Sequence, residues 1–576
     1  MMGSIYARKR NGTTYYVYQE ALRVKVDPLR DGKTKGSGKS TVRTKVTYLG
    51  TAEKILNALQ QKKEPVSVSI REFGLIAAAY QTSVEIGLPE ILSRCLPGER
   101  GGIPCWLYFL ISIINRLDQA TSKNKMRQWL SKTILPDVLG LNARKFTGKN
   151  FWYATDDIIP QKQFLQSRNS ATESPHLFLN LREDIFTKIE MELFSTIDDL
   201  VGLSPGVVCY DTTNFYTYFQ EPKRSELANT CHSKDSKSHL KHIGLLMAVD
   251  KNSGIPLLSQ VYEANRHDSR IFSCILADLV MSLKKMCGNQ SDVVIVLDKG
   301  NNSKENFKAM HGMISWVGAL VPSHHKQLIE LDLSQYHGSW NDLRYYRTEK
   351  NIMGMPCAVL MTFNSATARK KEHSLQRGIE KLKKEILDRW NSYKKQPKGL
   401  TRGITRILEK NDYGPCLRVS VNHGHIHLDE NYEEIESRRV GFGKNLIFSD
   451  MVAAETGYLI DTYTQRAIIE SDFKLLKDET IIRFRPIRHW TDTKIRAHAF
   501  CCVLALTLMR VMQWKAHMAG YTVSPQFLKD ELSDIQDVIM VYNQAEARRK
   551  ITERSKVQEK LWRLFRLNEI EQMLQH

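Results

Sequence analysis

From residue 196 onward the hydrophobic pattern changes from a helical period to short apolar runs, and this change restricts the fold most. Strand-like runs cover 207–219, 242–250 and 255–265, a helical pattern covers 270–286, and another strand-like run covers 292–300. Three strands, a helix and a strand in this order predict a mixed β-sheet flanked by helices. We therefore expect an α/β protein.

The whole chain predicts a multidomain protein, because it is longer than one sheet domain and its hydrophobic periodicity changes from one segment to the next. The expected parts are a small β-rich basic module at 1–64, a helical DNA-binding region at 65–195, the first part of the α/β core at 196–325, an insertion subdomain at 326–448, the second part of the core at 449–515 and a polar, helical C-terminal tail at 516–576.

The charge balance indicates a polyanionic partner. Lys and Arg number 83 against 63 Asp and Glu, which gives a net charge of +20. Such an excess favours nucleic acid as the partner. A basic cluster in the N-terminal module could contact phosphate, although a solvated loop is the simpler explanation for each of its residues; it contains Lys33, Lys35, Lys39, Arg43 and Lys45.

Neither a membrane nor an exported location is expected. The apolar runs at 105–114 and 500–509 are about half the length that a bilayer requires, and the N-terminus lacks the apolar segment of a signal peptide. The ten cysteines form no CxxC pair, which is typical of reduced thiols in a cytoplasm. The sequence therefore predicts a cytoplasmic protein without membrane contact.

Two aspartates follow apolar runs in the sheet region. Asp211 follows VVCY and Asp298 follows VVIVL, so we expect each carboxylate at the carboxyl edge of a strand, where α/β sheets commonly bind ligands. The alternative for each is a turn or a helix cap.

A second polar feature lies at 461–479, DTYTQRAIIESDFKLLKDE, which favours a helix. At 3.6 residues per turn, Tyr463, Arg466, Glu470 and Lys477 fall within roughly a 60° sector of such a helix. A solvated face with an Arg466–Glu470 pair is the alternative.

Asp211, Asp298 and Glu470 together form a set of three carboxylates. Such a set can hold two divalent ions, of which one activates an attacking water or hydroxyl and the other stabilises a leaving phosphodiester oxygen. Mg²⁺ fits because it prefers hard oxygen ligands. A basic protein with paired metals would be a nuclease or a strand-transfer enzyme.

The stretch 461–479 resembles the Y-R-E-K signature of DDE transposases from insertion sequences of the IS-four-like type. In this chain, two residues separate Tyr463 from Arg466, three separate Arg466 from Glu470, and six separate Glu470 from Lys477. The segments CYDTTNFYTYF and VLDKGNNS resemble the first and second aspartate motifs of that family. The resemblance covers 205–510. It implies a ribonuclease-H-like core in which a β-rich insertion separates Asp298 from Glu470.

The resemblance also implies an activity and its partners. The enzyme would cleave the ends of an insertion sequence and join the freed 3′-hydroxyls to target DNA, with Asp211, Asp298 and Glu470 holding two Mg²⁺ or Mn²⁺ ions. Tyr463, Arg466 and Lys477 would hold DNA phosphates near the cut. The partners would be the terminal inverted repeats, the target DNA and a second protomer in a paired-end complex, in the nucleoid of a prokaryote.

A hairpin intermediate, also implied by the family, would require an extruded base stacked on an aromatic ring. Trp316 and Trp340, just before and within the expected insertion, are the candidates. A packing role is the alternative for each, since Trp is common in cores and interfaces.

Two other functions stay open. The protein could be a non-catalytic DNA-binding derivative of a transposase, or a ribonuclease-H-like nuclease that cuts without joining. His232, Lys234 and Asp235 could approach the site, although loop hydrogen bonding is the simpler role for them.

Overall fold

The structure is a computed structural model of the chain. It describes residues 3–10, 12–25, 40–55, 65–156, 184–203, 206–218, 225–231, 237, 239–287, 293–392, 397–422, 425–542 and 547–575. The chain divides into two compact units, of which the first comprises Met1–Ile70 with Asp537–Thr552 and the second comprises Arg71–Gln536 with Glu553–His576.

The first unit is built from two small antiparallel sheets. One has the order β1-β2-β3, with β1 at Gly3–Arg10, β2 at Thr13–Lys25 and β3 at Ser40–Thr51. Gly12, in the turn between β1 and β2, has a φ of 76°, a conformation that glycine adopts without strain. The other sheet has the order β17-β16-β4, with β4 at Ser67–Glu72, β16 at Gln536–Val541 and β17 at Ala547–Ile551.

The β16–β17 hairpin corrects the expectation of a helical tail at 516–576. Only part of that region is helical: the helices there are the end of α18, α19 at Pro525–Ser533, α20 at Lys556–Leu564 and α21 at Leu567–Met573. The run QDVIMV at β16 is rich in β-branched and apolar residues and pairs with distant β4. Such long-range pairing leaves little signal in a local window of sequence.

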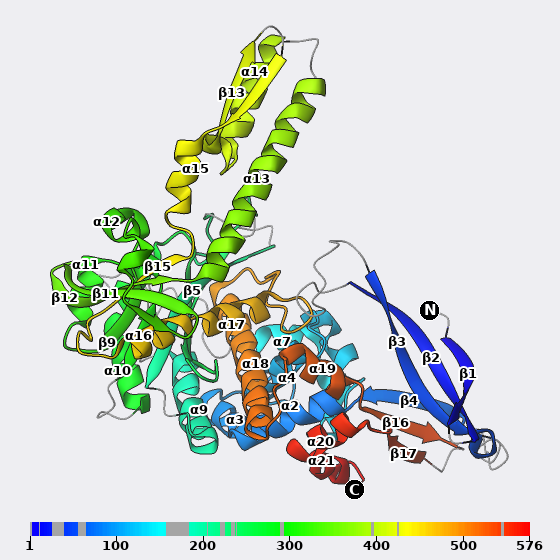
Figure 1. The fold of residues 1–576 in the computed structure, drawn as a ribbon. Coiled ribbons are helices and arrows are strands. Elements are labelled where there is room, and N and C mark those ends of the chain that lie inside the picture. Colours follow the sequence, from blue (N-terminus) through cyan, green and yellow to red (C-terminus); the bar gives the residue numbers. More distant parts are fainter. Residues whose placement is uncertain are drawn as a thin grey trace. The chain divides into compact units, whose positions relative to one another are not determined.

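A nine-stranded mixed sheet forms the centre of the second unit, in the order β10-β11-β12-β15-β9-β8-β5-β6-β7 (Figure 1). Its strands are β5 at Val207–Tyr216, β6 at His242–Asp250, β7 at Pro256–Glu263, β8 at Val294–Leu297, β9 at Ser315–Ala319, β10 at Gly338–Trp340, β11 at Leu343–Ile352, β12 at Met355–Phe363 and β15 at Lys444–Ser449.

The strand directions match the expected core. β5, β6 and β7 are antiparallel neighbours, whereas β5, β8 and β9 run parallel. Every residue of β6, β7 and β8 is buried, so this half of the sheet lies inside the unit. A mixed sheet of this kind is consistent with the ribonuclease-H-like core that the resemblance implies.

The insertion is shorter in the structure than the expected 326–448, and it is not β-rich. β10, β11, β12 and β15 belong to the central sheet, because β12 pairs with β15 and β15 with β9. What is inserted between β12 and β15 is mainly helical. It consists of α13 at Ser365–Ser392, α14 at Pro397–Lys410, β13 at Leu417–Asn422, β14 at His425–Glu430 and α15 at Tyr432–Arg439.

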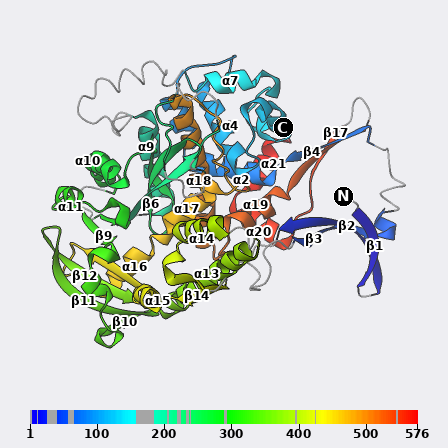
Figure 2. The ribbon, with the colours of Figure 1, turned by 90° about the horizontal axis from the view of Figure 1, so that it is seen from above.

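We call this inserted segment, residues 365–439, the arm. α13 contacts α14 and β14 (Figure 1 and Figure 2). The arm has its own apolar cluster, formed by Leu375, Ile379, Leu382, Ile386, Ile404, Cys416, Leu417 and Ile435. A separate cluster of this kind lets the arm fold as a small element of its own.

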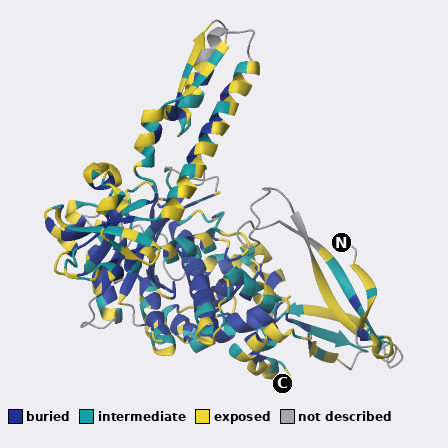
Figure 3. Ribbon diagram, in the orientation of Figure 1, coloured by how far each residue is buried: buried dark blue, intermediate teal, exposed yellow. Residues whose placement is uncertain are grey.

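Helices pack against the β7 side of the sheet. The longest is α18 at Asp492–Met518, which contacts β7 and α4 and is buried along most of its length (Figure 3). By length and composition α18 could cross a membrane, but 94% of its apolar window is buried inside the fold, as in a core helix. Helices that the described residues form before β5 include α2 at Gly74–Glu85, α3 at Leu88–Cys95, α4 at Cys105–Leu117, α5 at Met126–Leu130, α6 at Leu135–Val138, α7 at Gly148–Tyr153 and α9 at Ile185–Val201.

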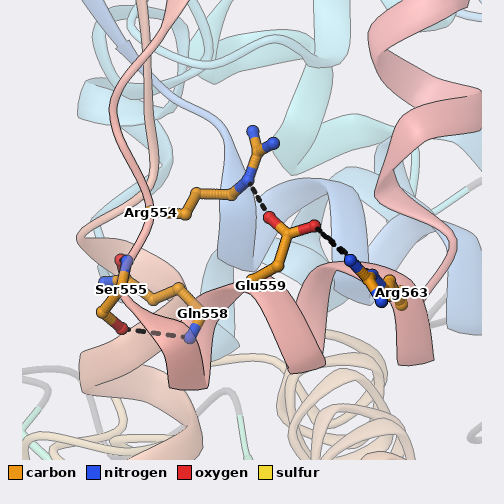
Figure 4. A network of polar contacts seen from close by, with 5 residues as sticks. All are labelled: Arg554, Ser555, Gln558, Glu559 and Arg563. Carbon is orange, nitrogen blue, oxygen red and sulfur yellow. Dashed lines mark hydrogen bonds and ion pairs between the residues drawn. The ribbon is translucent and has the colours of Figure 1, made fainter.

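The last helices are fixed by a polar network (Figure 4). Ser555 and Gln558 form a reciprocal capping box at the start of α20, with donor–acceptor distances of 2.8 and 3.1 Å. Glu559 accepts a hydrogen bond from Arg554 at 2.9 Å and pairs with Arg563. The Arg554 guanidinium lies 3.9 Å from the centre of the Trp562 ring on α20, and this ring stacks on Phe73 with ring centres 5.4 Å apart.

Candidate active site

The strand register brings Asp211 and Asp298 together. β5 and β8 run parallel, and their last matched pair is Tyr210 with Leu297, so the next residue on each strand is an aspartate. The expectation that Asp211 ends its strand is wrong, because β5 continues to Tyr216 and pairs with β6. Asp298 does follow the end of β8 and precedes a short 3-10 turn.

The predicted single helix at 461–479 is two helices in the structure. α16 spans Thr456–Thr464 and α17 spans Ala467–Lys477. Between them, Arg466 N–H donates to the Tyr463 carbonyl at 3.1 Å and Ile469 N–H donates to the Arg466 carbonyl at 3.2 Å. These three-residue bonds tighten the turn, and Arg466 keeps helical dihedral angles, so the chain continues with little change of direction.

Arg466 links two of the three carboxylates. Its guanidinium lies 3.2 Å from Asp298 Oδ1 and 2.8 Å from Glu470 Oε1. Burial disfavours the charge on Arg466, but the surrounding groups overcome this and raise the pKa of its guanidinium. Those groups are Tyr463, Asp298, Glu470 and Asp211. The negative field of all three carboxylates therefore converges on one guanidinium.

Tyr463 forms the buried side of this cluster. Its side chain is only 7% exposed, and the Arg466 guanidinium lies 5.6 Å from the centre of its ring. Burial raises the pKa of the Tyr463 phenol, which stays protonated at neutral pH and can donate a hydrogen bond.

Lys477 lies at the other end of α17. It is seven residues from Glu470, a rise of about 10 Å along a helix, and its ammonium lies 5.6 Å from the centre of the Phe215 ring on β5. Phe215 in turn stacks on Phe484 with ring centres 3.9 Å apart. The four residues of the signature are therefore brought to one side of α16 and α17 but not into one contact.

The donor chemistry fits Mg²⁺ or Mn²⁺, since the three side chains offer only hard carboxylate oxygens. Among the described residues, however, no group of three His, Cys, Asp or Glu side chains is close enough to hold a metal ion as it stands. The cation between Asp298 and Glu470 is the Arg466 guanidinium. A metal ion would have to compete with Arg466 for these carboxylates.

The two tryptophans differ in their surroundings. Trp316, on β9, is 0% exposed and packs against Phe307 with ring centres 5.3 Å apart, so its proposed stacking on DNA is corrected to a core role. Trp340 is 40% exposed, and its Nε1–H donates to Asp461 on α16 at 2.9 Å. A side chain at Gly457 would collide with the Trp340 indole, at 2.7 Å. Trp340 thus rests on α16 with one part of its ring exposed.

Sequence reasoning missed the residue that braces α17. Arg510, on α18, contacts Asp472 at 2.6 Å and Ser471 at 3.3 Å, both on α17. Asp472 is fully buried and Arg510 is nearly so. An arginine within the apolar pattern of α18 was the available signal, because a charge there needs a buried partner.

Several expected contacts fall outside the described residues. His232, Lys234 and Asp235 lie there, as do Lys33, Lys35 and Lys39. Arg43 and Lys45 are on β3, in the first unit.

The second unit is thus an α/β fold in which acidic side chains lie around Arg466 near the junction of β5 and β8. The family model described as "Transposase DDE domain" matches residues 202–508, more than half of the chain, so the chain belongs to this family. A domain of this family implies a transposase, and such enzymes generally use divalent metal ions.

The other comparisons add little. No functionally curated protein matches the chain. Among solved structures, it is similar to a piggyBac transposase synaptic complex with hairpin DNA, with 8% sequence identity, a TM-score of 0.39 and coverage of 80% of this chain and 76% of that chain. A similarity of this size supports no conclusion about this chain.

Proposed function

We propose that the protein cleaves the ends of a mobile DNA element of the IS-four-like type and joins the freed 3′-hydroxyls to target DNA. The family supports the transposase class, and one structural observation supports the site. This observation is the bridge that the Arg466 guanidinium forms between Asp298 and Glu470, together with the β5–β8 register that places Asp211 beside Asp298. Three carboxylates drawn from two neighbouring strands and a helix make a concentrated negative site on a protein of net charge +20.

In this proposal Asp211, Asp298 and Glu470 hold two Mg²⁺ or Mn²⁺ ions. The bound metals would supply an activated hydroxyl nucleophile and charge stabilisation at the leaving oxygen. Arg466 then exchanges its carboxylate contacts for a DNA phosphate, to which its planar guanidinium can donate two hydrogen bonds. Tyr463 donates to a neighbouring phosphate oxygen, and Lys477 holds a phosphate about 10 Å further along the DNA.

The partners in this proposal are double-stranded DNA, at the terminal inverted repeats and at the target, and a second protomer in a paired-end complex. Excision proceeds through a hairpin, with Trp340 as the stacking surface for an extruded base, because Trp340 is partly exposed beside α16. The enzyme acts in a prokaryotic cytoplasm, on the nucleoid.

Cleavage and joining of a labelled duplex that carries an element end tests the proposal. Glu470→Gln should abolish cleavage in Mg²⁺ while DNA binding persists, because the change removes one charge and keeps the shape. Glu479→Gln is the matched control, since Glu479 is an exposed carboxylate just after α17. Equal cleavage by the Glu470 variant and the control would mean that the metals do not bind here.

The products separate the alternatives. Cleavage followed by strand-transfer products with a target duplication supports a transposase. Cleavage alone would indicate a nuclease of the same fold. Specific DNA binding without any Mg²⁺- or Mn²⁺-dependent cleavage would indicate a non-catalytic DNA-binding derivative.

A further inference from the structure

The long helix α13 of the arm has two opposite faces. Leu375, Ile379, Leu382 and Ile386 form its buried side, within the apolar cluster of the arm. The opposite side, at 100° per residue, carries four exposed cations whose directions fall within roughly 60° of one another. These cations are Lys370, Arg377, Lys381 and Lys384. We call them the α13 basic row; Glu380 and Glu385 lie on its two flanks and Asp388 ends it.

Some acidic residues of the arm form ion pairs that hold the arm together. Glu372 pairs with Arg439 at 2.6 Å, which joins α13 to α15. Lys383, on the side of α13 toward the hairpin, pairs with Glu430 at 2.6 Å. By contrast, no ion pair joins any member of the basic row to another residue that the structure describes. The four cations of the row therefore face outward, and the acidic side chains nearest to them along the helix are Glu380, Glu385 and Asp388.

The base of α13 is fixed to the central sheet. Asn364, between β12 and α13, donates its N–H to the Gly443 carbonyl at 2.8 Å, and its side-chain oxygen accepts from Thr367 N–H at 2.7 Å. Because the Glu372–Arg439 pair lies within the first turns of α13, the start of the helix is held on two sides. The row is thus a stiff line of charge about 21 Å long, from Lys370 to Lys384.

We propose that the α13 basic row is a docking surface for the phosphate backbone of double-stranded DNA. This inference rests on the proposed function and adds a second DNA contact, on the arm, to the carboxylate site. Duplex DNA carries one negative charge per about 1.7 Å of its axis, so a straight row of four cations on a stiff helix matches it better than it matches a flexible acidic peptide. Lys and Arg without base contacts would bind without sequence preference.

The test measures binding of a labelled random-sequence duplex in EDTA, where no cleavage occurs, over a series of salt concentrations. One variant combines Lys370→Gln, Arg377→Gln, Lys381→Gln and Lys384→Gln, which keep good helix formers in α13. The charge-matched control changes four exposed lysines of other helices to Gln: Lys188, Lys285, Lys308 and Lys326. A third variant, Lys370→Arg with Lys381→Arg and Lys384→Arg, keeps the charge of the row.

We expect the row variant to bind more weakly and to flatten the salt dependence of log affinity by about one unit per lost contact, up to about four. The control should lose clearly less affinity for the duplex than the row variant, and the arginine variant should bind like the natural protein. Equal losses in the row variant and the control would overturn the proposal, because they would reflect net charge alone. Unchanged binding by a row variant that melts like the natural protein would overturn it as well.

Competition identifies the occupant. Poly-glutamate that displaces the duplex as well as unlabelled DNA does, charge for charge, would overturn the assignment to DNA. Because the assay excludes metal and chemistry, its outcome is independent of the cleavage test. If the protein binds DNA through the row but never cleaves it, the proposed activity is wrong and the proposed docking surface still stands.

Discussion

The guanidinium of Arg466 lies 3.2 Å from the carboxylate of Asp298, although the two residues come from different parts of the sheet core. Arg466 also contacts Glu470, so a protein cation bridges two of the expected metal ligands. This contact offsets part of the negative charge of the site without metal and sets up a competition between arginine and divalent ions. A guanidinium released from the carboxylates would be free to hold phosphate.

Arg466→Gln should therefore change metal binding and catalysis in opposite directions. Without DNA, Mn²⁺ should bind about fivefold more tightly, if the lost competition is worth ~1 kcal/mol, while DNA cleavage falls. Calorimetric titration with Mn²⁺ measures the first effect. Arg488→Gln, at an exposed arginine, is the control. Weaker Mn²⁺ binding in the Arg466 variant would contradict the competition.

Arg510→Gln should destabilise the protein by about 3–5 kcal/mol, because it leaves the buried Asp472 carboxylate without its partner. The double change Arg510→Met with Asp472→Leu should cost much less, since no charge is then left buried. Urea unfolding of the three proteins measures both effects. If the single and double variants lose the same stability, the pair does not hold α17 in place.

Glu190 should make stability depend on pH. Burial raises the pKa of its carboxyl to about 8, and hydrogen bonds from Ser259 oppose the rise only in part. The folded state therefore holds this proton more tightly than the unfolded state, whose pKa is about 4.3. The stabilisation is complete below about pH 4.3 and is lost as the pH rises to about 8.

Glu190→Gln should remove this dependence. From about pH 4.3 to about pH 8, the free energy of unfolding of the Glu190→Gln variant should rise relative to that of the natural protein, by up to about 5 kcal/mol. Thermal melts at several pH values measure the difference, and Glu192→Gln, on the same helix and half-exposed, should show none of it. A constant difference between Glu190→Gln and the natural protein would mean that Glu190 is ionised throughout.

Trp340→Ala should reduce hairpin formation about 5- to 150-fold, as expected from stacking worth about 1–3 kcal/mol per base. Trp340→Phe should keep most of the activity, since it keeps an aromatic face. Asp461→Ala removes the hydrogen bond to Trp340 but keeps the indole, so it separates stacking from support of α16. Gel analysis of excision products gives the readout, and normal hairpin yield from Trp340→Ala would exclude the stacking role.

Local patterns in the sequence determined the class of the central sheet and the residues of the candidate site. The apolar runs before Asp211 and Asp298 predict buried strands, and the spacing from Tyr463 to Lys477 predicts one helical face. These inferences work because burial of an element repeats with its own period. The expectation of a single helix over 461–479 was wrong, because two helices meet at Arg466.

The tertiary structure alone decided which strands share the sheet and which side chains meet. The pairing of β12 with β15 assigns residues on both sides of the arm to the core, and the β5–β8 register makes Asp211 and Asp298 neighbours. The same packing buries Trp316 and leaves Trp340 partly exposed. Strand pairing and burial depend on residues far apart in the chain, so a local window of sequence carries neither.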